Sequence, residues 1–166
     1  MAQARNIRST ILVVGEGAGE CRLLEHVRAE YLRNHAGFHA TIKDARGRGA
    51  GHVVDFAIRH IKQADYDHAA VLLDTDADFN VKVLARAKQA GIVVIASDPC
   101  LEAWLLDIAG QRAQRSTADH KRAFRDRFGR VAQDQRVYPE HFPRAVLDGA
   151  RLRVITLHDL LKTLGV

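Results

Sequence analysis

The chain has 166 residues, of which 47% are hydrophobic and 27% are charged. These shares are those of an ordinary globular protein and exclude a disordered or fibrous one, and the length suits one domain over 1–166. The formal net charge of +5 at pH 7 favours a polyanionic partner such as nucleic acid without requiring one.

The start of the chain and its cysteines suggest a cytoplasmic protein that makes no membrane contact. The opening residues 1–17, "MAQARNIRSTILVVGEG", contain an apolar run too short to span a membrane, and no small-residue cleavage site follows a hydrophobic region. Cys21 and Cys100 lie far apart and outside any C-x-x-C pair. We therefore expect two buried small side chains rather than a disulfide framework or a zinc ribbon.

Apolar runs alternate with segments of helical period up to about residue 109, which predicts β-α-β units and a parallel sheet. The third strand, "HAAVLLD", has an unbroken apolar character, so it should be buried on both faces. The expected fold is α/β, with a mainly parallel sheet of four to five strands flanked by helices in a core over about 8–109. Strands are expected at 10–14, 38–45, 68–74 and 91–97, and helices at 20–34, 52–63, 79–89 and 101–108.

Beyond about residue 109 the apolar pattern weakens and the charge rises. We expect a helical, basic insertion or subdomain over about 110–143, then a last short strand and a closing helix over about 144–166. Two short stretches concentrate positive charge: "RGRGAGH" at 46–52 and "KRAFRDRFGR" at 121–130. For either stretch alone, a solvated surface is as good an interpretation as a phosphate-binding role.

The first candidate site, "VVGEGAGE" at 13–20, follows the first expected strand. A dinucleotide-binding loop would need glycine where Glu20 stands, and the Glu20 carboxylate would repel a pyrophosphate. A P-loop is excluded as well, because no Gly-Lys-Ser/Thr follows Gly15 at the required distance. The glycines instead allow a sharp turn that leaves Glu16 projecting at the strand tip. A purely structural turn is the alternative.

The second candidate site, "DTDADF", places Asp74, Asp76 and Asp78 at alternate positions after the apolar third strand. Mg²⁺ takes oxygen ligands, and a cation makes neighbouring carboxylates tolerable that would otherwise repel one another. An EF-hand is excluded, because its sixth position would be Phe79 rather than Gly and its twelfth Ala85 rather than Glu. The alternative is a polar turn in which Asp78 caps the next helix, a role that we expect for Asp78 in either case.

The third candidate site is "SDPCLEAW", residues 97–104, after the fourth expected strand. Pro99 suits the head of a helix, Asp98 is a candidate cap for that helix, and Trp104 is expected in the core. Glu102 lies in the first helical turn, where the helix dipole stabilises it without any ligand. It could equally orient a metal-bound water.

Taken together, these motifs resemble the Toprim domain, the metal-dependent module of topoisomerases, bacterial primases, OLD-type nucleases and small ribosomal-RNA maturases. More closely, "GEGAGE", "DTDADF" and "SDPCLEAWLL" are similar to the RloB-like branch. That branch has Glu-Gly-x-x-Thr-Glu, then Asp-x-Asp-Asp-Phe, then Ser-Asn-Pro-x-Phe-Glu-x-Trp-Leu-Leu. The resemblance covers about residues 11–106, and the chain departs from the pattern at Gly19, Ala77, Asp98 and Leu101.

The resemblance implies a Rossmann-like Toprim fold and phosphodiester hydrolysis with Mg²⁺ or Mn²⁺. On that basis Asp74 and Asp76, joined by Asp78, hold the metal, while Glu16 acts as general base or acid or as a further ligand. Glu20, Asp98 and Glu102 would support these residues without binding the metal themselves. Topoisomerases also need a tyrosine nucleophile on another domain, and primases need zinc and template-binding domains. A nuclease is the activity that remains.

The leading hypothesis is a Mg²⁺-dependent nuclease acting on RNA or DNA, in a defence system or elsewhere. Its expected phosphate contacts are Arg46, Arg48, Lys121, Arg122 and Arg125. One alternative is an accessory subunit that keeps the metal-binding fold but works only with a partner protein or as a homodimer. Another is a phosphohydrolase acting on small phosphate esters or nucleotides. His52 and His141 are interpreted as surface residues.

Overall fold

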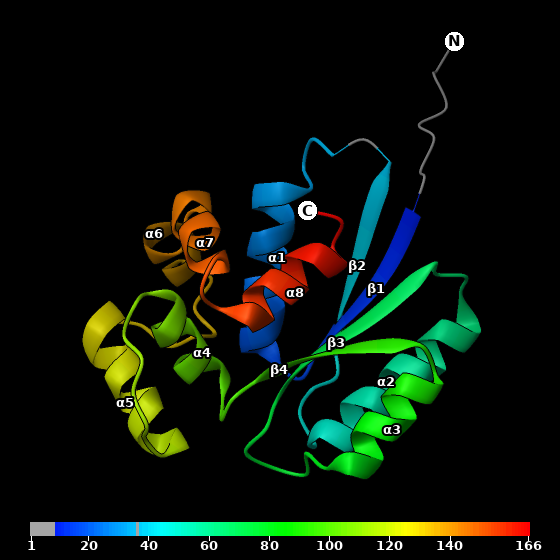
Figure 1. Ribbon diagram of the computed structural model, residues 1–166, viewed down its shortest axis with the longest axis horizontal. Coiled ribbons are helices and arrows are strands. Elements are labelled where there is room, and N and C mark those ends of the chain that lie inside the picture. The colour runs from blue at the N-terminus through cyan, green and yellow to red at the C-terminus, as the bar shows by residue number, and fades with distance from the viewer. Residues whose placement is uncertain (1–8, 36) are drawn as a thin grey trace.

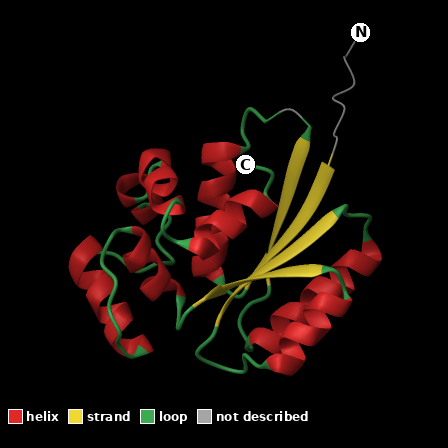
Figure 2. Cartoon of the chain, viewed as in Figure 1, coloured by secondary structure: helices red, strands yellow, loops and turns green. Residues whose placement is uncertain are grey.

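The computed structural model describes residues 9–35 and 37–166, so the first eight residues of the opening stretch lie outside the description. Its centre is a four-stranded parallel sheet with helices on both faces (Figures 1 and 2). The strands are β1 (Ser9–Gly15), β2 (Phe38–Asp44), β3 (His68–Asp74) and β4 (Ile92–Ser97). The helices are α1 (Ala18–Tyr31), α2 (Ala50–Gln63), α3 (Val81–Gln89), α4 (Leu101–Ile108), α5 (Thr117–Phe128), α6 (Val137–His141), α7 (Arg144–Arg151) and α8 (Ile155–Thr163).

The strand order β2-β1-β3-β4 places a reversal of chain direction at the centre of the sheet. From β1 the chain moves to one side to form β2, and it then crosses to the other side of β1 to form β3 and β4. Gly15, the last residue of β1, is paired with Asp44 of β2 and with Leu72 of β3. Open parallel sheets bind ligands in the crevice outside the carboxyl ends of the strands at such a switch point. We therefore expect a ligand-binding site at the edge of the sheet beyond Gly15 and Asp74.

Alternate residues of β1 belong to two separate hydrophobic cores. Ile11 and Val13 pack into a core with α1 and the helices from α4 to α8, whereas Leu12 and Val14 pack into a core with α2 and α3. This alternation follows from the two-residue period of a strand. Helices therefore cover the sheet on both faces, as the unbroken apolar character of β3 predicts.

The expected strand within 144–166 is wrong: the residues after β4 that the structure describes contain helices and turns but no strand. Val154 and Ile155 suggest a strand when read alone. The following leucines, however, recur at helical spacing and are buried, at Leu157, Leu160, Leu161 and Leu164. Helix α8 consequently lies against the sheet, where it contacts β4, and does not extend it.

Residues 110–143 are helical as expected, with α5 and α6 joined by turns. Their buried aromatic rings, such as Phe124 and Phe142, belong to the same core as α1 and the sheet. The buried Tyr138 hydroxyl contacts the carbonyl oxygens of Ala132 at 2.7 Å and Gly19 at 3.1 Å. This segment is thus an integral cover of one face of the sheet.

The expectation for both cysteines is confirmed, because Cys21 and Cys100 are buried and free. Burial raises the pKa of the Cys21 thiol to about 12 and that of Cys100 to about 11. Neither is therefore a reactive thiolate near neutral pH. Within 9–35 and 37–166, no helix combines the length and the apolar character needed to cross a membrane.

Candidate functional site

The tips of β1 and β3 are joined by Glu16. Its backbone N–H donates to the carbonyl oxygen of Leu72 at 2.9 Å, and its Oε2 accepts a hydrogen bond from the backbone N–H of Asp74 at 2.9 Å. The carboxylate of Glu16 and the first residue of the second motif are therefore in direct contact at the switch point. The ends of two neighbouring strands thus bring Glu16 and Asp74 together.

Gly15 at the end of β1 and Gly19 in the first turn of α1 permit close approach of the backbone to neighbouring groups. A Cβ added at Gly15 would lie 2.8 Å from the Cys21 sulfur, and one added at Gly19 would lie 2.8 Å from Leu101 Cδ2. Helix α1 can therefore start immediately after the strand tip. Glu20, in its first turn, is 7% exposed, and its Oε2 accepts from the backbone N–H of Gly17 at 3.0 Å. A second carboxylate is thus buried close to Glu16.

Asp74 and Glu20 are both carboxylates that resist ionisation. Burial raises the pKa of Asp74 to about 8, and the negative charges of Glu20, Glu16 and Asp76 add to this rise. The Ser97 hydroxyl, which donates to Asp74 Oδ1 at 2.7 Å, acts in the opposite direction. Burial likewise raises the pKa of Glu20 to about 7, with smaller contributions from neighbouring carboxylates. Four acidic groups therefore repel one another at this edge of the sheet.

The third motif supports the loop that carries Asp76. The backbone N–H groups of Thr75 and Asp76 donate to the carbonyl oxygen of Pro99 at 3.2 and 3.1 Å, and the Thr75 hydroxyl donates to Asp98 Oδ1 at 2.6 Å. Asp76 Oδ2 in turn accepts from the Thr117 hydroxyl at 3.0 Å. Helix α5 therefore begins directly beside Asp76.

The expected cap role of Asp98 is wrong, because Cys100 occupies the N-cap position of α4 and Asp98 uses a carboxylate oxygen for Thr75. Glu102 lies in the first turn of α4 and is 7% exposed. Its charge contributes to the raised pKa of Glu20, which places it at the margin of the carboxylate group. Trp104 is buried, as expected for a core residue.

The expected cap role of Asp78 is also wrong. Asp78 has a left-handed backbone with φ of 54°, so α3 begins later, and Asn80 is its cap. The Asn80 Oδ1 accepts from the backbone N–H groups of Lys82 at 3.0 Å and Val83 at 3.1 Å. Asp78 instead lies against the loop after β2, where a Cβ added at Gly49 would come within 2.6 Å of its Oδ2.

The assignment of Asn80, and not Asp78, as the cap of α3 predicts different results for substitutions at these two positions. Asn80→Ala should lower the free energy of unfolding by about 1 kcal/mol, because two N–H groups of α3 lose their acceptor. Asp78→Asn should change it by less than about 0.5 kcal/mol, since asparagine also tolerates positive φ. Urea unfolding followed by circular dichroism measures both. A larger loss in Asp78→Asn than in Asn80→Ala would contradict the cap assignment.

The carboxylates at the switch point lack basic partners. Across the described residues, no ion pair with Lys, Arg or His involves Glu16, Glu20, Asp74, Asp76 or Glu102. Uncompensated carboxylates of this kind require either a proton or a cation, and oxygen donors suit Mg²⁺. In the side-chain positions described, no three His, Cys, Asp or Glu residues are placed to hold a metal ion. The donor chemistry therefore fits a divalent cation, but the carboxylates would have to move closer together to hold one.

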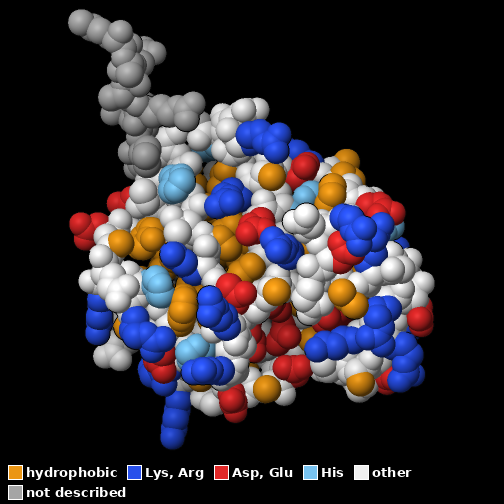
Figure 3. Space-filling model, turned by 180° about the vertical axis from the view of Figure 1, so that it is seen from behind, with side chains coloured by type: hydrophobic (Ala, Val, Ile, Leu, Met, Phe, Trp, Pro, Cys, Tyr) orange, Lys and Arg blue, Asp and Glu red, His pale blue; other side chains and the backbone are white. Residues whose placement is uncertain are grey.

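Basic residues lie on both sides of this acidic group (Figure 3). On one side, Arg46 and Arg48 are exposed in the loop between β2 and α2. The N–H of Gly47 donates to the carbonyl oxygen of Glu16 at 2.7 Å, which holds this loop against the strand tip. On the other side, α5 begins beside Asp76 and carries the exposed predicted phosphate contacts Lys121, Arg122 and Arg125.

Two hydroxyl groups that donate hydrogen bonds to the aspartates, those of Ser97 and Thr117, were not among the residues predicted from the sequence. Ser97 could have been noticed as the only polar residue at the end of an apolar strand, but Thr117 is far from the motifs in sequence. His52 and His141 bond or pack elsewhere: His52 Nε2 lies 3.1 Å from the carbonyl oxygen of Ala45, and the His141 ring packs on Phe128.

The chain was compared with known protein families, curated proteins and solved structures. The family described as RloB-like protein matches residues 11–141. The matched range contains all three motifs, and it continues beyond the expected limit of 106 through α5 and into α6. No curated protein and no solved structure matches the chain. With most of its length matched, the chain belongs to the RloB-like protein family.

Proposed function

We propose that the chain is a Mg²⁺-dependent nuclease of Toprim type that hydrolyses phosphodiester bonds of nucleic acid. The observation that carries this proposal is the group of mutually repelling carboxylates without basic partners at the switch point. Structural carboxylates are normally paired or solvated, whereas perturbed pKa values in a crevice are typical of functional sites.

Asp74 and Asp76 are the residues that we propose to hold the metal, and Glu16 and Asp78 are further candidates. A bound Mg²⁺ or Mn²⁺ would activate a water and stabilise charge on the phosphate oxygens. The chain's own contribution is orientation: the Ser97 hydroxyl fixes the Asp74 carboxylate, and the Thr117 hydroxyl fixes that of Asp76.

Two other carboxylates are available for proton transfer. Glu16 lies between the strand tips, where it can serve as base or acid or as a further ligand. Glu20 has a pKa raised to about 7 by burial, so it can accept a proton at Oε1 near neutral pH while Oε2 stays bonded to Gly17. We propose that the exposed arginines and lysines on both sides position phosphates and do not read bases.

A cleavage assay of the purified full chain tests the proposal. Labelled RNA and DNA of mixed sequence, single- and double-stranded, are incubated with Mg²⁺, with Mn²⁺ or with EDTA. We expect cleavage only with metal, and a loss of about 100-fold or more in Asp76→Ala, because a metal contributes several kcal/mol to transition-state stabilisation. The matched control is Asp159→Ala, which removes an exposed acid on α8 and should cleave normally.

The other outcomes identify the alternatives. Metal binding by calorimetry without cleavage of any polymer would contradict the nuclease and favour the partner-dependent accessory subunit. Faster hydrolysis of mononucleotides than of polymers would favour the phosphohydrolase. Equal cleavage by the wild type and Asp76→Ala would reject the site itself.

A further inference from the structure

A hollow of about 610 Å³ opens beside the loop between β2 and α2, and Arg46 and Arg48 of this loop line it. Strand β2, which forms one edge of the sheet, and helix α2 provide its walls. The basic side chains that line it are Lys43, Arg46, Arg48, His52, Arg59 and His60.

The charge of this hollow is almost entirely positive. Asp44 is the one acid among its lining residues, and Asp44 Oδ1 already accepts the backbone N–H of Arg46 at 2.7 Å. Among the described residues no ion pair engages the four permanent cations Lys43, Arg46, Arg48 and Arg59. Four cations without counter-charges create a potential that attracts a polyanion.

Helix α2 holds part of this charge in place through an aromatic ring. The Phe56 ring stacks on that of His60 at 4.2 Å with an interplanar angle of 27°, and the Arg59 guanidinium lies 5.9 Å from the Phe56 centroid. His60 Nδ1 also lies 2.9 Å from the carbonyl oxygen of Phe56. The Arg59 guanidinium at this end of the hollow therefore has limited freedom, which reduces the entropy lost when it binds an anion.

The hollow and the carboxylates share one wall. Gly47 donates to the carbonyl oxygen of Glu16, and Gly49 lies directly against Asp78. All four residues from Arg46 to Gly49 have positive φ, between 62° and 84°, so the loop folds tightly between the two regions. An extended polyanion that lies at the carboxylates could therefore continue over this loop into the hollow.

We propose that this hollow binds backbone phosphates of a nucleic-acid strand, flanking the phosphodiester that lies at the carboxylates. The inference rests on the proposed function for the position of cleavage, and it adds the side of the molecule along which the substrate runs. The new phosphate contacts are Lys43 and Arg59, with His52 and His60 adding charge when protonated.

The test measures binding separately from cleavage. Fluorescence anisotropy with labelled single-stranded RNA or DNA in EDTA compares wild type, Lys43→Ala/Arg59→Ala, and the control Lys88→Ala/Arg33→Ala. Both double variants lose one lysine and one arginine that are exposed. We expect about tenfold weaker binding at low salt and a salt slope lower by about 1.4 for the hollow variant, since each phosphate contact in a single strand contributes about 0.7. The control should stay within about twofold.

Each other result is informative. Equal weakening by both double variants, with normal circular dichroism, would overturn the proposal in favour of net charge alone. Binding of adenosine monophosphate as tightly as of the oligonucleotide would overturn it in favour of a nucleotide pocket. Selective weakening in the hollow variant, combined with no cleavage by wild type in Mg²⁺, would uphold the hollow and reject the nuclease.

Discussion

Asp74→Asn should abolish metal-dependent cleavage, by about 100-fold or more, and at the same time stabilise the metal-free protein above pH 5. The loss of activity follows from removal of a proposed metal ligand with little change in shape. The gain in stability follows from the burial of Asp74 among Glu20, Glu16 and Asp76, where its ionised form is unfavourable. Opposite signs for activity and stability are the mark of a residue retained for function.

The pH dependence of unfolding gives this prediction its sign. The pKa of Asp74 is raised in the folded protein from 3.8 to about 8. The folded state therefore binds the proton more tightly, so the contribution to stability is complete below about pH 4 and is lost as pH rises through 8. In EDTA the free energy of unfolding of wild type should fall by at least about 1.4 kcal/mol between pH 5 and 8, the equivalent of one unit of pKa. Asp74→Asn should show a clearly smaller fall.

Denaturant unfolding in EDTA and in Mg²⁺, at several pH values, makes the measurement. Mg²⁺ should raise the stability of wild type above pH 7, because a ligand that binds only the folded state stabilises it. It should leave Asp74→Asn unchanged, while the control Asp159→Asn should respond like wild type. An Asp74→Asn protein that keeps the wild-type pH slope would contradict the buried-carboxylate interpretation.

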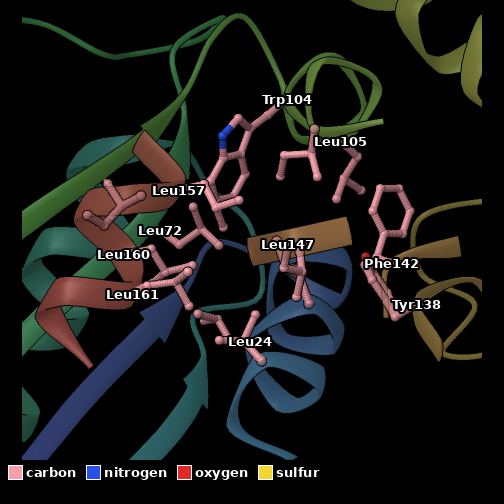
Figure 4. Packing of buried hydrophobic residues seen from close by; sticks show 14 of the residues in the cluster. Leu24, Leu72, Trp104, Leu105, Tyr138, Phe142, Leu147, Leu157, Leu160 and Leu161 are labelled. Atoms are coloured by element: carbon pink, nitrogen blue, oxygen red, sulfur yellow. The ribbon is translucent and has the colours of Figure 1, made fainter. Parts of the chain in front are cut away.

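Leu147→Ala should lower the free energy of unfolding by about 2–5 kcal/mol, whereas Leu152→Ala should change it by less than about 0.5 kcal/mol. Leu147 of α7 is 0% exposed, and Figure 4 shows it between Leu24, Phe142 and Leu161. Leu152, at the end of the same helix, is 88% exposed. The same chemical change therefore creates a cavity at one position and removes only solvated surface at the other.

Urea unfolding of both variants by far-UV circular dichroism and by Trp104 fluorescence measures this difference. Trp104 belongs to the same core as Leu147, so the two probes should report one transition. Separate transitions, or a small loss in Leu147→Ala, would mean that α7 and α8 unfold independently of the sheet.

The alternating architecture could be predicted from the sequence because β1, β3 and β4 are short apolar runs bounded by turn residues. The ends of β3 and α4 agree with the expected limits to the residue. The prediction of a last strand was wrong because Val154 and Ile155 favour a strand locally, whereas the four leucines that follow bury one face of a helix. Packing on a tertiary surface decided between two local preferences.

The carboxylates of the site were predictable because parallel strands end at a common edge, so residues after β1 and β3 must be neighbours. The caps were not. Both Asp78 and Asp98 have the residue type of a cap, yet the backbone of Asp78 is left-handed and the oxygen of Asp98 is taken by Thr75. The Thr117 contact to Asp76 depends on how α5 packs, which no local pattern records.

Residues of the C-terminal third of the chain form hydrogen bonds with helix α1. Tyr138 bonds the carbonyl oxygen of Gly19, His26 Nε2 lies 2.7 Å from that of Phe142, and the Tyr31 hydroxyl donates to Asp148 at 2.7 Å. A fragment ending after α4 would lose all three contacts and uncover the apolar face of α1, the helix that carries Glu20. We therefore expect the sheet to fold only together with the helical C-terminal third that covers α1.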